Sequence, residues 1–180
     1  MQIPAVGLHN VYNVLFGIAC GVELGLEIEE VFTGISNYQP EKMRLNIIEK
    51  NGIKFINDCY NACPDSMKSG LQVLKSLAKD NRSFAILGNM FELGDMATAA
   101  HYDIGKVCKE LGIDFTAIIG ENANDIAKGI GDINKYKIFE THEEIVEYLE
   151  GILQKGDVVL VKGSRGMKME RVLELIGAMA

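Results

Sequence analysis

Short strand-like runs and longer helix-like segments alternate regularly from Pro64 to the end of the chain. The strand-like runs are rich in β-branched residues, and in the helix-like segments apolar side chains recur every three or four positions. We expect helices near residues 64–78, 96–111, 122–130, 142–152 and 168–176, and strands near residues 83–87, 115–119, 136–139 and 157–161. Because parallel strands are joined by crossover helices, this order predicts a largely parallel sheet with helices packed on its faces.

The first part of the chain is helical in pattern. Apolar side chains follow helical spacing between residues 9 and 24, and a second helix is expected over residues 28–35. Pro40 ends this region, because proline cannot continue a helix and disfavours helix in the residue before it. We therefore expect a boundary near residues 37–42, with a helical segment over residues 1–38 and a separate domain over residues 39–180.

A hairpin is expected directly after this boundary. The runs 45–50 and 53–57 are separated by Asn51-Gly52, a pair that favours the tight turn between two antiparallel strands. From about residue 42 the expected fold is thus α/β, a three-layer sandwich of the Rossmann type. Its sheet is mostly parallel, with one early antiparallel element.

Composition excludes several classes of protein. The chain has 180 residues, 48% of them hydrophobic, and a formal net charge of −7 without a long basic run, which argues against a nucleic-acid partner. No apolar run approaches the roughly 20 residues of a membrane span, and no signal-peptide pattern opens the chain, so we expect a cytoplasmic protein without a membrane partner. The four cysteines fit neither a disulfide framework nor a zinc site, and we expect reduced thiols at Cys20, Cys59, Cys63 and Cys108.

Three polar loops follow strands at one predicted edge of the sheet, over residues 58–66, 88–95 and 162–166. The last of them, Lys162-Gly-Ser-Arg-Gly166, carries two cations between glycines. At the carboxyl ends of parallel strands, glycines let backbone amides approach oxyanions closely, so this loop can hold an anion. A basic surface turn with a glycine hinge is the alternative interpretation of the loop by itself.

Individual polar residues near this edge have two interpretations each. Asp58 directly follows a strand and can accept the hydroxyls of a ribose, or it can cap a turn. Asn61 and Ser66 can orient a peptide or carboxylate, although both residue types also dominate ordinary turns. Arg44 offers a planar forked donor to phosphate or carboxylate, or it is an exposed surface arginine.

The first helix and the second loop offer further candidates. Asn10 and Asn13 lie three apart, so they share one side of a helix and can together read an adenine edge, although capping explains Asn10 alone. Glu92 and Asp95 fit acid/base or metal chemistry, and equally fit solvated helix starts. The chain contains no Gly-x-x-x-x-Gly-Lys-Ser/Thr loop, which excludes a complete P-loop ATPase.

Together these motifs resemble those of the Mur ligase family, which builds the peptidoglycan stem peptide. The resemblance is carried, in the family's order, by Gly7-Leu-His-Asn-Val-Tyr-Asn13, Met43-Arg-Leu45, Asp58-Cys-Tyr-Asn-Ala-Cys-Pro-Asp-Ser66, Leu87-Gly-Asn-Met-Phe-Glu-Leu-Gly94 and Lys162-Gly-Ser-Arg-Gly-Met-Lys-Met-Glu170. Within the family, the motif over residues 58–66 and the Lys162-Gly-Ser-Arg165 motif resemble the member that adds D-alanyl-D-alanine to UDP-N-acetylmuramoyl-tripeptide.

The resemblance implies that residues 1–38 are the tail of a central ATPase domain and that the remainder is the family's C-terminal domain. It implies ATP as phosphoryl donor with Mg²⁺, and places the UDP-sugar domain, the P-loop and the magnesium ligands outside this chain. ATP-binding roles fall on Asn10, Asn13, Arg44 and Asp58. Catalytic roles at the reacting phosphate fall on Lys162 and Arg165, and substrate-binding roles fall on Asn61, Ser66 and Ser164.

Three positions depart from the family's pattern. Cys63 stands where the family commonly has asparagine, Asn89 where it has aspartate, and Met43 where it has glycine. The first change removes a side-chain amide, and the second gives a neutral residue to which we assign no metal role.

The implied reaction passes through an acyl phosphate of the tripeptide carboxylate, which the amine of D-alanyl-D-alanine attacks. Lys162 and Arg165 would offset negative charge there. The chain alone is expected to be inactive, since it lacks a P-loop. The alternatives are a noncatalytic dipeptide- or anion-binding module, or a different Mur ligase.

Overall fold

The computed structural model describes residues 3, 5–39 and 41–179. The chain divides into two compact units, Met1–Lys42 and Met43–Ala180. The first unit is a pair of helices, α1 (Leu8–Glu23) and α2 (Ile28–Ser36). Large apolar side chains of this unit stay exposed, and they include Leu8, Tyr12, Leu15, Phe16, Val22, Leu24 and Leu26.

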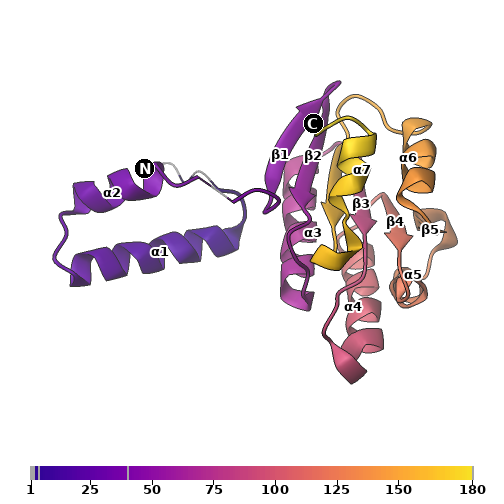
Figure 1. Ribbon diagram of the computed structural model, residues 1–180, viewed down its shortest axis with the longest axis horizontal. Coiled ribbons are helices and arrows are strands. Elements are labelled where there is room, and N and C mark those ends of the chain that lie inside the picture. The colour runs from indigo at the N-terminus through magenta and orange to yellow at the C-terminus, as the bar shows by residue number, and fades with distance from the viewer. Residues whose placement is uncertain (1–2, 4, 40, 180) are drawn as a thin grey trace. The chain divides into compact units, whose positions relative to one another are not determined.

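The second unit is a six-stranded sheet in the order β1-β2-β6-β3-β4-β5 (Figure 1). The strands are β1 (Asn46–Lys50), β2 (Ile53–Asp58), β3 (Ser83–Leu87), β4 (Phe115–Ile119), β5 (Tyr136–Phe139) and β6 (Val158–Lys162). Only β1 runs antiparallel, and it pairs with β2 as the predicted hairpin. Asn51 and Gly52 at its turn both have positive φ, 53° and 75°, as a type I′ turn requires.

Helices cover both faces of this sheet, which confirms the predicted three-layer α/β class. The helices are α3 (Pro64–Ala78), α4 (Ala97–Glu110), α5 (Ala123–Ile130), α6 (His142–Glu150) and α7 (Glu170–Leu175). Buried side chains of α6 and α7 pack with Phe55, Ile86 and Val159 in one core cluster. On the other face, α3 lies against β6, where Gly70 approaches Leu160 and Lys162.

One expected helix begins later than the sequence suggested. The segment Arg165–Met167 is a 3-10 turn, and α7 starts at Glu170 instead of residue 168. The turn is closed by bonds from Met167 N to Ser164 O and from Lys168 N to Arg165 O. Lys168 then adopts a left-handed conformation with φ 49°, which separates the turn from the helix.

Candidate functional site

The three polar loops lie together, as the sequence predicted, because β2, β6 and β3 are neighbouring parallel strands. Their carboxyl ends share one edge of the sheet. Gly88 N donates to Lys162 O at 2.8 Å, and Ser164 N donates to Asn89 O at 2.9 Å. Backbone hydrogen bonds therefore continue past the end of the strands and join the loops that start there.

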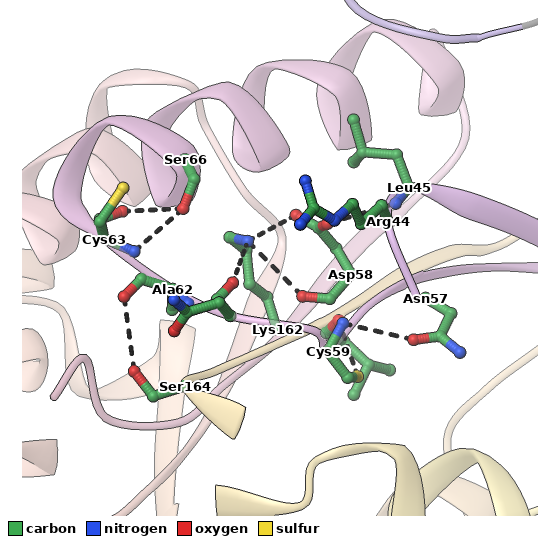
Figure 2. A network of polar contacts seen from close by, with 12 residues as sticks. Arg44, Leu45, Asn57, Asp58, Cys59, Ala62, Cys63, Ser66, Lys162 and Ser164 are labelled. Atoms are coloured by element: carbon green, nitrogen blue, oxygen red, sulfur yellow. Dashed lines mark hydrogen bonds and ion pairs between the residues drawn. The ribbon is translucent and has the colours of Figure 1, made fainter. Parts of the chain in front are cut away.

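Lys162 lies at the centre of this edge and is only 1% exposed. Its Nζ forms an ion pair with Asp58 Oδ2 at 2.6 Å, and it donates to Asn61 O at 3.0 Å and to Asp58 O at 3.5 Å (Figure 2). Asp58 is also nearly buried, at 9% exposed. The sequence predicted both residues as ligand contacts, and the structure gives them a buried ion pair with each other.

Arg44 is exposed beside this pair, in a backbone segment of unusual conformation. Met43 and Leu45 on either side of it have φ values of 63° and 52°, which are uncommon for residues other than glycine. Leu45 N donates to Asp58 Oδ1 at 3.2 Å, and Tyr60 N donates to Met43 O at 3.1 Å. The Arg44 guanidinium lies 4.3 Å from the centre of the Tyr60 ring, within cation–π range.

The loop between β2 and α3 holds the next two predicted residues. Asn61 is exposed, and its side-chain oxygen accepts from Ala62 N at 2.8 Å. The Ser66 hydroxyl accepts from Cys63 N and donates to Cys63 O, both at 3.0 Å, and so closes the first turn of α3. Cys63, at the position where the family's pattern has asparagine, thus acts as the N-cap of α3 in a capping box.

Ser164 and Arg165 differ in accessibility. Ser164 is 3% exposed, and its Oγ accepts from Phe91 N at 2.8 Å and faces Ala62 O at 3.4 Å, so this hydroxyl links all three loops. Arg165 is exposed, and its Nη1 lies 2.8 Å from Glu170 Oε1 and 3.4 Å from Met43 Sδ. Arg165 therefore presents a guanidinium at the same edge as Arg44.

Two residues that support the second loop, Asn89 within it and His101 in α4, have roles that no local sequence pattern marks. Asn89 is buried, and its Oδ1 accepts from Asn122 N at 3.2 Å, which ties the loop after β3 to the one after β4. His101 is fully buried; its Nε2 accepts from Met90 N at 2.9 Å, and Nδ1 lies 2.7 Å from Ala97 O. Both side chains hold this loop in place by hydrogen bonds. His101 reaches Met90 only because α4 packs against the loop, a tertiary contact that the local sequence does not reveal.

Asn10 and Asn13 lie in the first unit and share one side of α1, as the sequence predicted. Asn13 Nδ2 donates to Asn10 Oδ1 at 3.3 Å, and Asn10 Nδ2 donates to Val6 O at 2.8 Å. Asn13 is exposed. The two side-chain amides therefore lie next to each other on one side of α1.

Other features of the described chain lie outside this edge. Within residues 3, 5–39 and 41–179, no three His, Cys, Asp or Glu side chains are grouped so as to hold a metal ion. No helix in the same ranges is long and apolar enough to cross a membrane. A cleft of about 410 Å³ is lined by residues of β5 and α6, including Lys137 and Tyr148, at the far edge of the sheet from β2.

Known proteins resemble this chain over nearly all of its length. The UDP-N-acetylmuramoyl-tripeptide--D-alanyl-D-alanine ligase of Bacillus subtilis (strain 168) is 34% identical over 176 residues, which are 96% of this chain and 38% of that protein. A crystal structure of MurF from Acinetobacter baumannii has a TM-score of 0.88 at 33% identity, covering 98% of this chain and 39% of that one.

A crystal structure of MurF ligase from Thermotoga maritima in complex with ADP has a TM-score of 0.75 at 28% identity, covering 88% of this chain and 35% of that one. The chain thus spans less than half the length of each of these relatives. A family model described as Mur ligase, glutamate ligase domain matches residues 43–165, which are more than half of the chain. The chain therefore belongs to the Mur ligase family.

Proposed function

We propose that this chain is the C-terminal part of an ATP-dependent ligase that joins D-alanyl-D-alanine to UDP-N-acetylmuramoyl-tripeptide in peptidoglycan precursor synthesis. The observation that carries the proposal is the 34% identity to the Bacillus subtilis ligase of that name over 96% of this chain. We further propose that the reaction takes place in the cytoplasm.

In this proposal residues 1–38 are the helical tail of the central ATP-binding domain, and residues 39–180 are the C-terminal domain. The apolar side chains exposed on α1 support the assignment, because a contiguous apolar surface on a helix marks an interaction face. The rest of the central domain and the UDP-sugar domain would be partners of this chain within one enzyme. The chain alone is then inactive.

ATP supplies the phosphoryl group that turns the tripeptide carboxylate into an acyl phosphate, which the amine of D-alanyl-D-alanine attacks. The contribution of this chain is positioned charge. Arg44 and Arg165 expose guanidinium groups at one edge, where they can offset charge on phosphate and on the tetrahedral oxyanion. Positioned donors of this kind are typically worth about 100- to 1000-fold in kcat.

The remaining predicted residues serve binding. Asn10 and Asn13 read the adenine edge, and Asp58 lies at the nucleotide ribose. Asn61, Ser66 and Ser164 shape the loops that receive the dipeptide; Asn61 is the exposed member of this set and the direct polar contact.

Magnesium is part of the proposed reaction, but the described residues do not fit a magnesium site. Mg²⁺ prefers carboxylate and phosphate oxygens, but Asp58 at this edge already faces Lys162 and Leu45 N, and no three His, Cys, Asp or Glu side chains in the described ranges are grouped to hold a metal ion. The magnesium ligands are therefore assigned to the part of the enzyme outside this chain.

The test uses the longest protein that contains this chain, with ATP, UDP-N-acetylmuramoyl-tripeptide and D-alanyl-D-alanine. We expect the pentapeptide product and phosphate in equal amounts, and no product from the 180-residue chain alone. Arg44→Ala is expected to raise KM for ATP about 10-fold or more, the scale of a lost charged hydrogen bond. Arg165→Ala is expected to lower kcat. Unchanged ATP kinetics in Arg44→Ala would contradict the assigned role.

A second candidate function, a noncatalytic dipeptide- or anion-binding module, follows from the missing P-loop. Calorimetry of the 180-residue chain separates the two. Tight binding of D-alanyl-D-alanine or ATP by this chain alone favours the module. Product formation with a different amino acid or peptide in place of D-alanyl-D-alanine identifies a different Mur ligase.

A further inference from the structure

We infer that Lys162 is a positioning residue, which acts through Asp58 and Asn61 to hold Arg44 in place. The inference rests on the proposed function and changes the role of Lys162 within it. The positively charged groups that meet phosphate are then the two exposed arginines, and Lys162 builds the support behind one of them.

The burial of Lys162 is the first step. An ammonium group has three N–H bonds, and Nζ has three acceptors: Asp58 Oδ2, Asn61 O and, at the longest distance, Asp58 O. Its aliphatic stem is covered by α3, where a Cβ added at Gly70 would lie 3.3 Å from Lys162 Cδ. A side chain that is 1% exposed and fully hydrogen-bonded has no donor to offer a ligand without breaking this arrangement.

Asp58 carries the effect of Lys162 to the segment around Arg44. Oδ2 faces Lys162 and Oδ1 accepts from Leu45 N, so one carboxylate bridges the buried cation and this backbone. Met43 and Leu45 both adopt left-handed conformations, which persist only where surrounding contacts impose them. The hydrogen bond from Leu45 N to Asp58 is one such contact.

Asn61 carries the effect of Lys162 to the other side of Arg44. Lys162 Nζ binds Asn61 O, which fixes the loop after β2 next to Tyr60. Tyr60 N donates to Met43 O, and the Tyr60 ring lies under the Arg44 guanidinium. Both routes from Lys162 therefore end on Arg44, one through the backbone at Leu45 and one through the ring of Tyr60.

The first experiment follows amide hydrogen exchange in the 180-residue chain and needs no activity. Lys162→Met removes the cation and keeps the stem. We expect the Leu45 and Tyr60 amides to exchange at least about 10-fold faster, the scale of a lost charged hydrogen bond, while the Lys54 amide, which donates to Asp157 O, keeps its rate. Unchanged exchange at Leu45 and Tyr60 overturns the inference.

The second experiment measures KM for ATP in the longer ligase, with Lys162→Met placed in the native and the Arg44→Ala backgrounds. A positioning role predicts a rise of about 10-fold in the native background and less than about threefold in the Arg44→Ala background, because the residue being positioned is gone. If Lys162→Met raises KM for ATP by the same factor in both backgrounds, Lys162 contacts the nucleotide itself and the inference is overturned.

Lys162→Met leaves Asp58 buried without its cation, so this variant can fail to fold. Gly70→Ala then takes its place, because the added methyl would lie 3.3 Å from Lys162 Cδ, close enough to displace this side chain slightly from α3 without changing any charge. We expect about threefold faster exchange at Leu45 and Tyr60. Gly34→Ala, a helix glycine with open space around it, is the matched control and leaves both amides unchanged. If the longer protein shows no ligase activity but the Leu45 and Tyr60 amides exchange faster as expected, the proposed function is rejected and the positioning role of Lys162 is retained.

Discussion

The four cysteines are expected to react with iodoacetamide at very different rates in the folded chain. Cys20 and Cys63 are exposed, and Cys59 and Cys108 are buried. A hydrogen bond from Ser66 lowers the pKa of Cys63 below its ordinary value of 9.0, which favours the reactive thiolate. Burial raises the pKa of Cys108 to about 12. Burial, together with the negative charges of Glu170 and Asp58, raises the pKa of Cys59 further.

The size of the effect follows from these values. The difference between 9.0 and about 12 at Cys108 is three pKa units, so near neutral pH its thiolate fraction is about 1000-fold below that of an ordinary cysteine. Restricted access of the reagent lowers the rate further. Cys63 should retain its thiolate to lower pH than it does in the unfolded chain, because a thiolate is the form present above the pKa.

The assay is mass spectrometry of the labelled chain over a pH series from about 6 to 9. Cys63→Ser and Cys20→Ser identify the two fast sites, and labelling in denaturant should make all four cysteines equivalent. The profile of each site is normalised to its own plateau, since nucleophilicity falls as the pKa falls. Native-state labelling of Cys108 within about 10-fold of Cys20, or a native Cys63 profile that rises at higher pH than the Cys63 profile in denaturant, would refute the reasoning.

Two further predictions concern stability. Gly105→Ala should lower the free energy of unfolding by about 1–3 kcal/mol in urea denaturation, because its Cβ would clash with the Ile126 carbonyl of α5, whereas Gly34→Ala should be neutral or stabilising. Asp114→Ala should cost about 1–2 kcal/mol at pH 7, since its carboxylate accepts from Ser83 N and Oγ. Burial opposes ionisation of Asp114, but these bonds outweigh it and lower its pKa below 3.8. Its contribution is therefore present above pH 3.8 and is lost as the pH falls through the folded pKa, so wild type and variant should converge in acid.

The fold could be predicted because its signals are local. The hairpin follows from Asn51-Gly52, and the parallel sheet follows from the alternation of short β-branched runs with amphipathic segments. The late start of α7 was missed, because nothing in the residues after Arg165 distinguishes a 3-10 turn from a first helical turn. That difference depends on Lys168 adopting a left-handed conformation, which any long side chain can do at a cost.

The location of the site at one edge of the sheet could be predicted, but the contacts between its side chains could not. Topology brings the ends of β2, β6 and β3 to one edge whatever side chains they carry. The partner of each side chain depends on packing, and Lys162 illustrates this. A lysine between a strand and a glycine is usually exposed, and here the absence of a side chain at Gly70 lets α3 close over it.

This packing also explains why three polar residues of the motifs are largely buried. Asp58, Lys162 and Ser164 form their hydrogen bonds with the three loops, which leaves Arg44, Arg165 and Asn61 exposed at the edge. Charge stabilisation in acyl transfer is effective when the donors are already oriented, since no energy is then spent on reorganising them during the reaction. In the proposed ligase, the buried ion pair of Lys162 and Asp58 would provide such orientation by holding the exposed Arg44, without either charge contacting the phosphate.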